Sequence, residues 1–397
     1  MSLLDRQNRF KRAYGALAGF FMLLSFMFLT SMFGANSLAV AQASNDMQAQ
    51  PPEQASAPDQ TQVPEQTPDQ TQVLEQAQAP EQTQAGQDAD TPISFVFDPL
   101  SAESWMKRLT HQVKSLSFEI VYVVSANKRE TLPYMWRRGK MPDNSSIEQL
   151  SLLNGPGFEQ VVHQGKVSIF EPGFPPYSVQ GTSVQGPIPQ AFVYEGQSFA
   201  EAYDVLLMGR NRVAGRMAQQ IRVISKDKTR YGYHLWLDEQ TGLLLKVDMY
   251  DLDNSLLEQI QVTQLTVSEN VNQIFAQFSV DQLPQVKART TASERDLMWR
   301  ASYLPQGMRV LKQDVHRIER TGQITEYMLL SDGLIDVSVY VLPANAAITE
   351  DISVASGSHA VVSKTDGRIQ VTVVGEIPVP TADKIANSIV IVDDPNG

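Results

Sequence analysis

The amino-acid sequence predicts an α+β protein with two antiparallel sheets of unequal size, and three observations support this prediction. Residues 221–262 contain four runs of strand-forming residues with turn signals between them. Residues 101–116 carry apolar side chains at helical spacing, which predicts an amphipathic helix. A second series of strand-like runs begins after residue 292 and ends in one amphipathic helix. We therefore expect a large sheet covered by helices and a smaller sheet closed by one helix.

The first 43 residues are predicted to be an export signal. Four basic residues within residues 6–12 precede an uncharged stretch over residues 13–43, and small residues at Ala39, Ala41 and Ala43 fit a cleavage site. The alternative is an uncleaved membrane anchor, because residues 16–33 are just long enough to span a bilayer. The chain has no cysteine, which excludes disulfides, thiol catalysis and a lipid-modified N-terminal cysteine. We expect export to the periplasm of a Gram-negative bacterium.

Residues 44–92 are predicted to be a disordered linker rich in Gln and Pro. Acidic residues are frequent in this segment, basic residues are absent, and large apolar residues are almost absent. Such a segment cannot bury enough apolar surface to fold and is expected to be a solvated spacer. The formal net charge of the whole chain is −12, which argues against nucleic acid as a partner.

A first folded domain is predicted over residues 93–282. Ser101 is expected to cap the first helix. Strands are expected at residues 118–124, 132–138, 151–153, 158–163 and 166–170, followed by a proline-rich loop, a short helix at residues 198–208 and the four-strand meander. The aromatic side chains of the loop, Phe174, Tyr177, Phe192 and Tyr194, could form a lid over a cavity or a small cluster beneath the loop.

Both faces of the meander strands carry apolar or aromatic residues. Residues 231–237 place tyrosine and leucine on one face and His234 and Trp236 on the other. An antiparallel sheet that faces water has a clearly polar face, so we expect this sheet to be covered on both sides. The cover could be protein packing or, on one side, an apolar ligand.

An interdomain linker is predicted at residues 283–292, followed by a C-terminal domain over residues 293–392. The expected strands are residues 303–313, 326–331, 335–342, 359–364 and 368–374. Thr381 is expected to cap a closing helix whose apolar face includes Ile385 and Ala386.

The sequence contains no catalytic or metal-binding motif. The five histidines are scattered, and there is no nucleophile elbow or phosphate-binding glycine loop. Asp251, Asp253 and Ser255 resemble the start of a calcium loop, but Leu256 and Val262 occupy the positions that need Gly and Glu. We expect no catalytic residue, no metal and no cofactor. A hydrolase site assembled across domains is an alternative that no linear motif would reveal.

Six basic residues lie at turns that the meander could bring to one end of the sheet. They are Arg210, Arg212, Arg216, Lys226, Lys228 and Arg230. They could be solvated hairpin tips. If clustered, they would suit phosphate groups or an acidic peptide, because guanidinium groups bind both with paired hydrogen bonds.

Eight separated motifs resemble the MucB/RseB family of sigma-E factor regulatory proteins, in the same order. They are FEPG at 170–173, GRNRVA at 209–214, IRV at 221–223, TRY at 229–231, LLEQ at 256–259, YLPQG at 303–307, LSDGL at 330–334 and VGEIP at 374–378. The resemblance covers about residues 93–390. It leaves out the Gln/Pro-rich linker, which departs from the short N-terminus of the family.

The resemblance implies a non-enzymatic periplasmic regulator of the envelope-stress response. The larger domain would be an antiparallel half-barrel covered by helices, similar to periplasmic lipoprotein carriers. The smaller domain would bind the periplasmic segment of a membrane-spanning anti-sigma factor and shield it from regulated proteolysis. Lipopolysaccharide or another acylated ligand would be the release signal. A soluble periplasmic carrier of lipids or lipoproteins is the alternative function, and a homo-oligomer is compatible with either.

Two groups of residues are the candidate sites on this interpretation. Apolar residues expected to line the cavity are Ile120, Tyr122, Val124, Leu235, Leu237, Leu245 and Val247. Residues expected to bind anionic groups of the ligand or partner are Arg210, Arg212, Arg216 and Arg230. A register error of one residue would turn the apolar set to the opposite face.

Overall fold

The computed structural model describes residues 97–126, 129–194, 199–286, 297–317, 324–344 and 351–391. The predicted signal peptide and Gln/Pro-rich linker lie outside the described residues, as does the predicted interdomain linker from residue 287 onward. Among the described residues, no helix combines the length and apolar character needed to cross a membrane.

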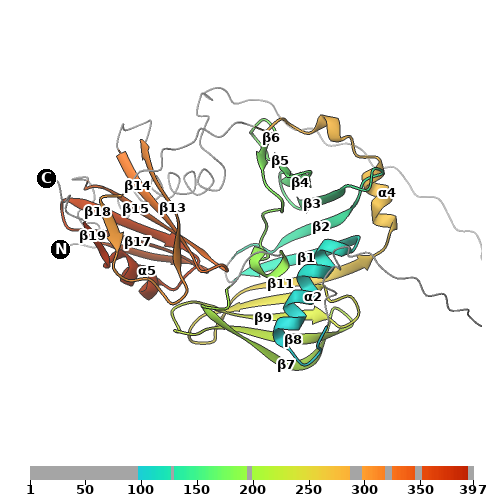
Figure 1. The fold of residues 1–397 in the computed structure, drawn as a ribbon, viewed down its shortest axis with the longest axis horizontal. Helices are drawn as coiled ribbons and strands as arrows, with labels where there is room; N and C mark the ends of the chain where they lie inside the picture. The colour runs from blue at the N-terminus through green and yellow to red at the C-terminus, as the bar shows by residue number, and fades with distance from the viewer. Residues whose placement is uncertain are drawn as a thin grey trace, which may run out of the picture. The chain divides into compact units, whose positions relative to one another are not determined.

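The first sheet has 11 strands, and every neighbouring pair is antiparallel (Figure 1). Its order is β6-β5-β4-β3-β2-β1-β11-β10-β9-β8-β7. The strands are β1 (Phe118–Ala126), β2 (Leu132–Lys140), β3 (Ser146–Leu152), β4 (Glu159–His163), β5 (Lys166–Phe170), β6 (Tyr177–Gln180), β7 (Tyr203–Val213), β8 (Arg216–Ser225), β9 (Gly232–Asp238), β10 (Leu244–Tyr250) and β11 (Leu256–Val267). The predicted four-strand meander is therefore confirmed as β8 to β11.

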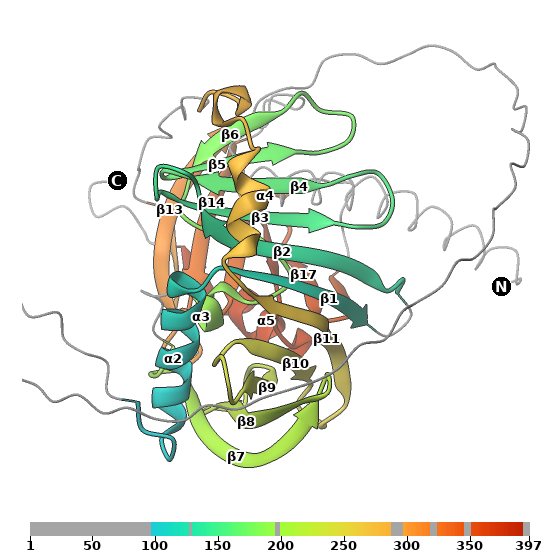
Figure 2. The same ribbon diagram turned by 90° about the vertical axis from the view of Figure 1, so that its right-hand side faces the viewer.

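Two meanders meet in the middle of this sheet, where β1 pairs with β11. The chain runs outward from β1 to β6, resumes at β7 on the opposite edge, and returns inward to β11. Figure 2 shows the strands stacked in this order. Because β6 and β7 form opposite edges, the chain between them has to cross the face of the sheet.

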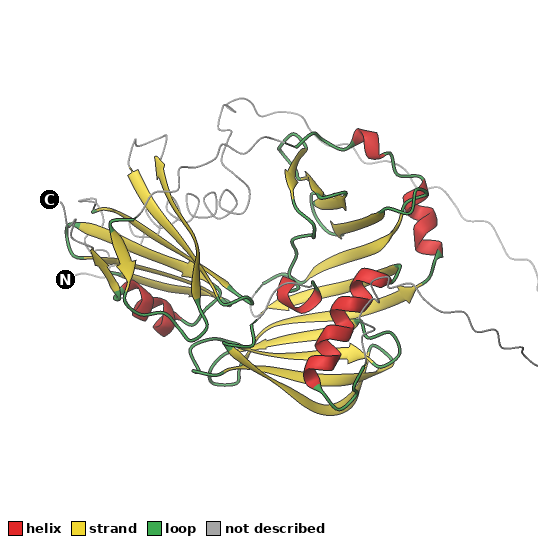
Figure 3. Cartoon of the chain, viewed as in Figure 1, coloured by secondary structure: helices red, strands yellow, loops and turns green. Residues whose placement is uncertain are grey.

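Short helices lie against this sheet. Helix α2 (Ala102–Ser115) begins after Ser101, whose side chain accepts a hydrogen bond from the Ser104 amide, so the predicted N-cap is confirmed. The one-turn helix α3 (Gln190–Val193) lies beside α2 (Figure 3). Helix α4 (Asn270–Ala276) and the 3-10 turn η1 (Val280–Gln282) follow β11, and Phe275 of α4 packs with Ile147 and Val161.

One predicted helix in this region is wrong. The described part of the predicted helix 198–208, residues 199–208, is not helical, because β7 begins at Tyr203 and continues to Val213. The run of consecutive apolar residues 205–208 fits either a short helix or a strand by periodicity alone. Pairing with β8, which no local signal reveals, decides for the strand.

The second sheet is antiparallel, with the order β13-β14-β15-β18-β17-β16. Its strands are β13 (Arg309–Arg317), β14 (Ile324–Ser331), β15 (Asp336–Pro343), β16 (Ile352–Ser356), β17 (His359–Thr365) and β18 (Ile369–Gly375). A separate pair joins β12 (Trp299–Ala301) to β19 (Ile389–Ile391). The predicted strand at residues 303–313 starts late, because residues 305–308 form a turn in which Gly307 has a positive φ.

Helix α5 (Val379–Ala386) packs on one face of the second sheet, where Ala382 and Ile385 join a core that includes Val337, Val339 and Val373. The cap residue predicted for this helix is wrong. Pro378 occupies the N-cap, since proline needs no amide partner at a helix start, and Thr381 lies inside the first turn. The fold class is confirmed: two antiparallel sheets, the larger open and partly covered by helices, the smaller closed by one helix.

Candidate ligand cleft and interdomain seam

All seven predicted cavity residues are buried, and six of them lie on one face of the first sheet. Val124 lies opposite Ile260 of β11, which lies opposite Val247 of β10, which in turn faces Leu235 of β9. Tyr122 and Leu237 lie two residues along their own strands and therefore share this face, as does Ile120 at the next position of β1. Leu245 is buried at a bulge, where the register of β10 with β9 shifts between Leu244 and Lys246. Alternation along the strands thus gathers most of the predicted set into one apolar surface.

A strap, defined as residues 181–194, follows β6, crosses this apolar face and includes α3. At Gly186 it lies so close to the sheet that an added Cβ would be 2.7 Å from Leu150 Cδ2. Gln160 fastens the strap with two hydrogen bonds, because its Nε2 donates to the Gln185 carbonyl at 2.8 Å and its Oε1 accepts from the Gln185 amide at 2.7 Å. The strap is therefore a cover that belongs to the protein itself.

The far end of the strap is fastened by a buried carboxylate. The Tyr194 hydroxyl donates to Glu148 Oε1 at 2.5 Å, and Trp136 Nε1 donates to the same oxygen at 2.6 Å. Arg138 forms an ion pair with the other oxygen at 3.0 Å. Burial raises the pKa of the Glu148 carboxyl, and Arg138 opposes this shift.

The aromatic residues predicted in the loop do not form a single cluster. Phe192 is fully buried in α3 and Tyr194 is fastened to the sheet, whereas Phe174 is exposed and Tyr177 belongs to β6. Phe192 packs edge-on against Tyr233, with ring centroids 5.4 Å apart. Of the two alternatives, a lid describes the loop better. The strap, which contains Phe192 and Tyr194, forms this lid, and Phe174 and Tyr177 do not take part.

Between the strap and the sheet remains a small cleft of about 10 Å³, which is room for about one water molecule. Its lining consists of Pro187 and Pro189 from the strap and Tyr233, Val247, Met249, Glu258 and Ile260 from the sheet. An acyl chain does not fit beside the strap in this conformation. A ligand that enters this face has to displace the strap.

Two polar groups border this apolar cleft. Burial, and then the nearby carboxylate of Glu376, raise the pKa of Glu258 to about 7. The hydroxyl of Tyr233 is buried and has no hydrogen-bond partner among the described residues, and burial raises its pKa. Both groups are available to the polar part of a ligand.

The four candidate arginines do not form one cluster. Arg210 and Arg212 lie near the end of β7, and Arg216 begins β8 beside them. Arg210 is exposed and lies 3.2 Å from Glu239, and Arg216 forms two hydrogen bonds with the buried carboxylate of Asp238. Arg230 follows the other end of β8, because successive turns of a meander lie at opposite ends of its strands. The structure therefore does not bring all six basic residues to one end of the sheet.

Arg230 instead lies at the seam, which we define as the contacts between residues 199–231 of the first sheet and residues 302–335 and 381 near the second. Its side chain is fully buried. Nη1 donates to Asp332 Oδ2 at 2.9 Å and to the Gln306 carbonyl at 2.8 Å, while Nη2 donates to Asp227 Oδ1 at 2.9 Å. One guanidinium therefore holds carboxylates from both sheets.

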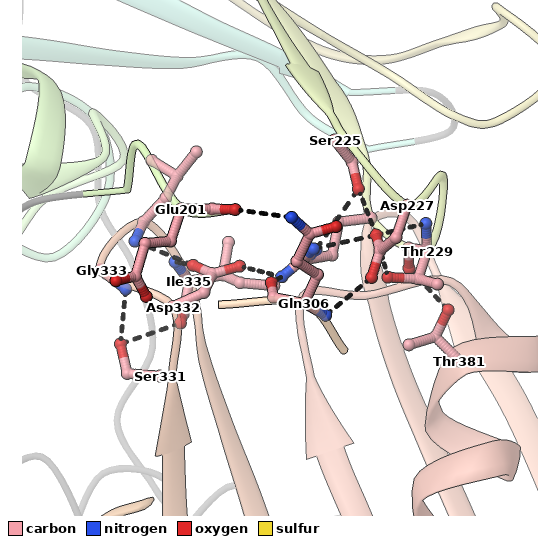
Figure 4. Close-up of polar contacts among 12 residues, drawn as sticks. Glu201, Ser225, Asp227, Thr229, Gln306, Ser331, Asp332, Gly333, Ile335 and Thr381 are labelled. Carbon is pink, nitrogen blue, oxygen red and sulfur yellow. Dashed lines mark hydrogen bonds and ion pairs between the residues drawn. The ribbon is translucent and has the colours of Figure 1, made fainter. Parts of the chain in front are cut away.

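Other polar groups close the seam around Arg230 (Figure 4). Asp227 Oδ2 accepts from the Gln306 amide at 2.8 Å, and the Thr381 hydroxyl donates to the Thr229 carbonyl at 2.6 Å. Asp227 also accepts hydrogen bonds from Ser225 and Thr229. Although burial opposes it, these hydrogen bonds together hold the pKa of Asp227 well below its usual value, so the carboxylate is charged.

Possible catalytic groups are sparse among the described residues. No three His, Asp or Glu side chains in the described ranges are grouped so as to hold a metal ion. Ser145 Oγ lies 2.9 Å from His163 Nε2, a distance that suits a nucleophile and its base. The Ser145 hydroxyl, however, donates its single proton to Asp143 Oδ1 at 2.5 Å, so the imidazole donates rather than accepts. The arrangement fastens a turn.

Sequence reasoning missed the strap and the seam. Gln185 of the strap and Gln160 of β4 give no local signal of their pairing. Asp332 lies between two predicted strands, residues 326–331 and 335–342, and its carboxylate accepts hydrogen bonds from the amides of Leu334 and Ile335. Asp366 accepts two backbone hydrogen bonds in the same way and is exposed, so this turn pattern does not reveal the buried charge.

Comparison with known proteins places this geometry in a family. Residues 101–287 match the model of the MucB/RseB N-terminal domain, and residues 293–390 match that of the MucB/RseB C-terminal domain. The sigma-E factor regulatory protein RseB of Salmonella typhimurium is 30% identical over 74% of this chain and 91% of its own length. The sigma factor AlgU regulatory protein MucB of Pseudomonas aeruginosa is 31% identical over 72% of this chain and 90% of its own length.

A solved structure agrees with the sequence relatives. The crystal structure of MucB in complex with MucA(peri) has a TM-score of 0.57 and 30% identity, and covers 74% of this chain and 100% of that one. The predicted resemblance is confirmed on both domains. This chain belongs to the MucB/RseB family.

Proposed function

We propose that this protein is a periplasmic negative regulator of an extracytoplasmic, sigma-E type stress response. It binds the periplasmic segment of a membrane-spanning anti-sigma factor and shields that segment from regulated proteolysis. A lipid or lipopolysaccharide that enters the covered face of the first sheet is the release signal. The action is steric occlusion and not catalysis, and export by residues 1–43 delivers the protein to the periplasm.

Family membership over both domains is the observation that carries this proposal. The relatives are named as regulators of sigma-E and AlgU, and the MucB structure was solved with MucA(peri) bound. Because this chain covers all of that MucB chain at 30% identity, the surface that binds a partner there has an equivalent here. The apolar face beneath the strap supports the lipid part of the proposal.

A protease-protection assay tests the proposal directly. The purified exported protein is mixed with the periplasmic segment of the host's anti-sigma factor and with its first-site protease, with and without lipopolysaccharide. The expected result is protection that lipopolysaccharide reverses. Cleavage of an unrelated substrate in the same mixture checks that the protease is not itself inhibited. A folded sample that neither binds nor protects the segment would refute the proposal.

We propose that Arg210 and Arg212 contact anionic groups of the partner or ligand. Both side chains are solvent-exposed at the end of β7, where they can reach a carboxylate or phosphate. Arg210→Gln with Arg212→Gln is expected to weaken binding of the partner or of lipopolysaccharide about tenfold. Arg300→Gln with Arg368→Gln is the matched control, because it removes two charges from exposed arginines outside the first sheet. An equal effect of both variants would indicate only a loss of net charge.

The apolar covered face also favours a second candidate, a soluble periplasmic carrier of lipids or lipoproteins. The domains are proposed to be residues 93–282 and 293–392, joined by a linker at 283–292. A carrier needs only the first of them. Deletion of the residues after Ala292 would leave lipid binding and the cellular phenotype intact for a carrier, but would abolish protection of the anti-sigma factor for a regulator.

A further inference from the structure

A continuous series of packed side chains connects the strap to the seam. The Phe192 ring packs edge-on against the Phe199 ring at a centroid distance of 5.8 Å, and Phe199 packs in the same way against Tyr203 at 6.0 Å. The guanidinium carbon of Arg230 lies 5.2 Å from the centroid of the Tyr203 ring. Phe192, Tyr203 and Arg230 are all almost completely buried. The strap and the seam therefore share one block of rigid rings.

Phe192 also connects this block to the cleft. Its ring packs against Tyr233, which lines the cleft beneath the strap. Phe192 belongs to the strap, so a displacement of the whole strap moves its ring away from Tyr233 and Phe199. The support of the Tyr203 ring, and with it the position of Arg230, then changes.

Arg230 is suited to respond in a two-state manner. Its guanidinium is enclosed between Asp227 of the first sheet and Asp332 of the second, and the side chains of Arg230 and Asp332 are fully buried. Removal of one partner from a buried ion pair leaves an uncompensated charge, so the seam is stable when fully closed or when open to water, but not half-formed. The named polar contacts of the seam come mostly from turns, which is the kind of interface that permits motion between domains.

We propose that Tyr203 and Arg230 couple occupancy of the covered face to the position of the second sheet. Displacement of the strap removes the support of Tyr203, Arg230 exchanges Asp332 and the Gln306 carbonyl for water, and the seam opens. A partner that binds the closed arrangement is then released. Arg230 acts here as a positioning residue. This inference rests on the proposed function only for the identity of the partner.

The first experiment measures hydrogen exchange of the exported protein alone, with and without lipopolysaccharide. For the unaltered protein, lipopolysaccharide is expected to raise exchange in the strap and at the seam, in residues 225–231 and 331–335. In Tyr203→Leu, lipopolysaccharide is expected to raise exchange in the strap but not at the seam. Arg137→Met is the matched control, because Arg137 forms a 2.6 Å ion pair with Glu119 away from this block, and should behave like the unaltered protein.

The second experiment measures the affinity for the anti-sigma segment with and without lipopolysaccharide. The unaltered protein is expected to lose affinity by about 5–150-fold, the usual range of allosteric coupling. Tyr203→Leu should reduce this factor to less than about threefold. The pair Arg230→Met with Asp332→Asn removes both charges of the buried pair, and the asparagine Oδ1 can still accept from the amides of Leu334 and Ile335. This pair should be equally insensitive.

The outcomes separate this inference from the proposed function. A seam that does not respond to lipopolysaccharide, or that still responds in Tyr203→Leu, overturns the inference. A seam response that Tyr203→Leu abolishes supports the inference even if the anti-sigma segment does not bind, in which case the proposed function fails by itself. Partner release that remains complete in the Arg230→Met, Asp332→Asn pair would show that the signal takes another route.

Discussion

Replacement of Glu258 by Gln should stabilise the folded protein above pH 7 and have no effect near pH 4. Burial and the neighbouring Glu376 raise the pKa of the Glu258 carboxyl from 4.5 to about 7. At low pH the carboxyl is protonated in the folded and the unfolded chain, so it makes no difference to stability. Between pH 4.5 and 7 the unfolded chain loses this proton first, and the free energy of unfolding falls as the pH rises.

The size of this loss follows from the shift. Each pKa unit corresponds to about 1.4 kcal/mol, so the folded protein loses about 3 kcal/mol from this group by pH 7 and no more above it. Glutamine keeps the shape of the side chain and removes the charge. The stability of Glu258→Gln relative to the unaltered protein should therefore increase from near zero at pH 4 to about 3 kcal/mol at pH 8.

Urea unfolding at pH 4, 5, 6, 7 and 8 measures this difference. Glu130→Gln is the control, because Glu130 is exposed in the turn after β1 and removal of its charge alters the net charge equally. The control should show a small difference that varies little with pH. A difference between Glu258→Gln and the unaltered protein that is independent of pH, or that is larger at pH 5 than at pH 8, would refute the reasoning.

Three further predictions test the cover, the seam and the core. Tyr194→Phe removes the donor to the buried Glu148 carboxylate and should cost about 2 kcal/mol in urea unfolding while raising hydrogen exchange in the strap; unchanged exchange there would contradict the fastening role. Gly307→Ala should open the seam, because Gly307 has a φ of 76° and an added Cβ would lie 2.9 Å from the backbone nitrogen of Ala202, just before β7. Gly367→Ala is the control for backbone strain alone, because Gly367 has a φ of 85° and open space around it. Leu235→Ala should cost about 2–5 kcal/mol in the same unfolding assay, and a cost below 1 kcal/mol would show that the apolar face tolerates a cavity.

Much of the first sheet was predictable because its signals are local. The turns at 238–242 and 251–255 and the alternation in residues 231–237 depend only on near neighbours, and β9, β10 and β11 follow them closely. The same alternation placed Leu235 and Val247 on one buried face. The segment that covers this face was not predictable. The strap lies there only because β6 and β7 are the opposite edges of the sheet.

The buried position of Arg230 was not predictable from the sequence. In the sequence it is one of several basic residues in turns, and such residues are usually solvated. Its partner Asp332 is 102 positions away, in a turn of the other sheet. Nothing within a few residues of either side chain indicates that the pair meets in a buried site.

The sequence alone therefore determined the two antiparallel sheets, the apolar face of the first sheet, the closing helix and the family, since each depends on periodicity, turn residues or short motifs. The tertiary structure alone decided the strand order, the strand β7 where a helix was predicted, the strap over the apolar face and the seam around Arg230. These features depend on which distant segments become neighbours. Burial of a charge or of a strand edge is a property of that arrangement, and no local pattern of residues contains it.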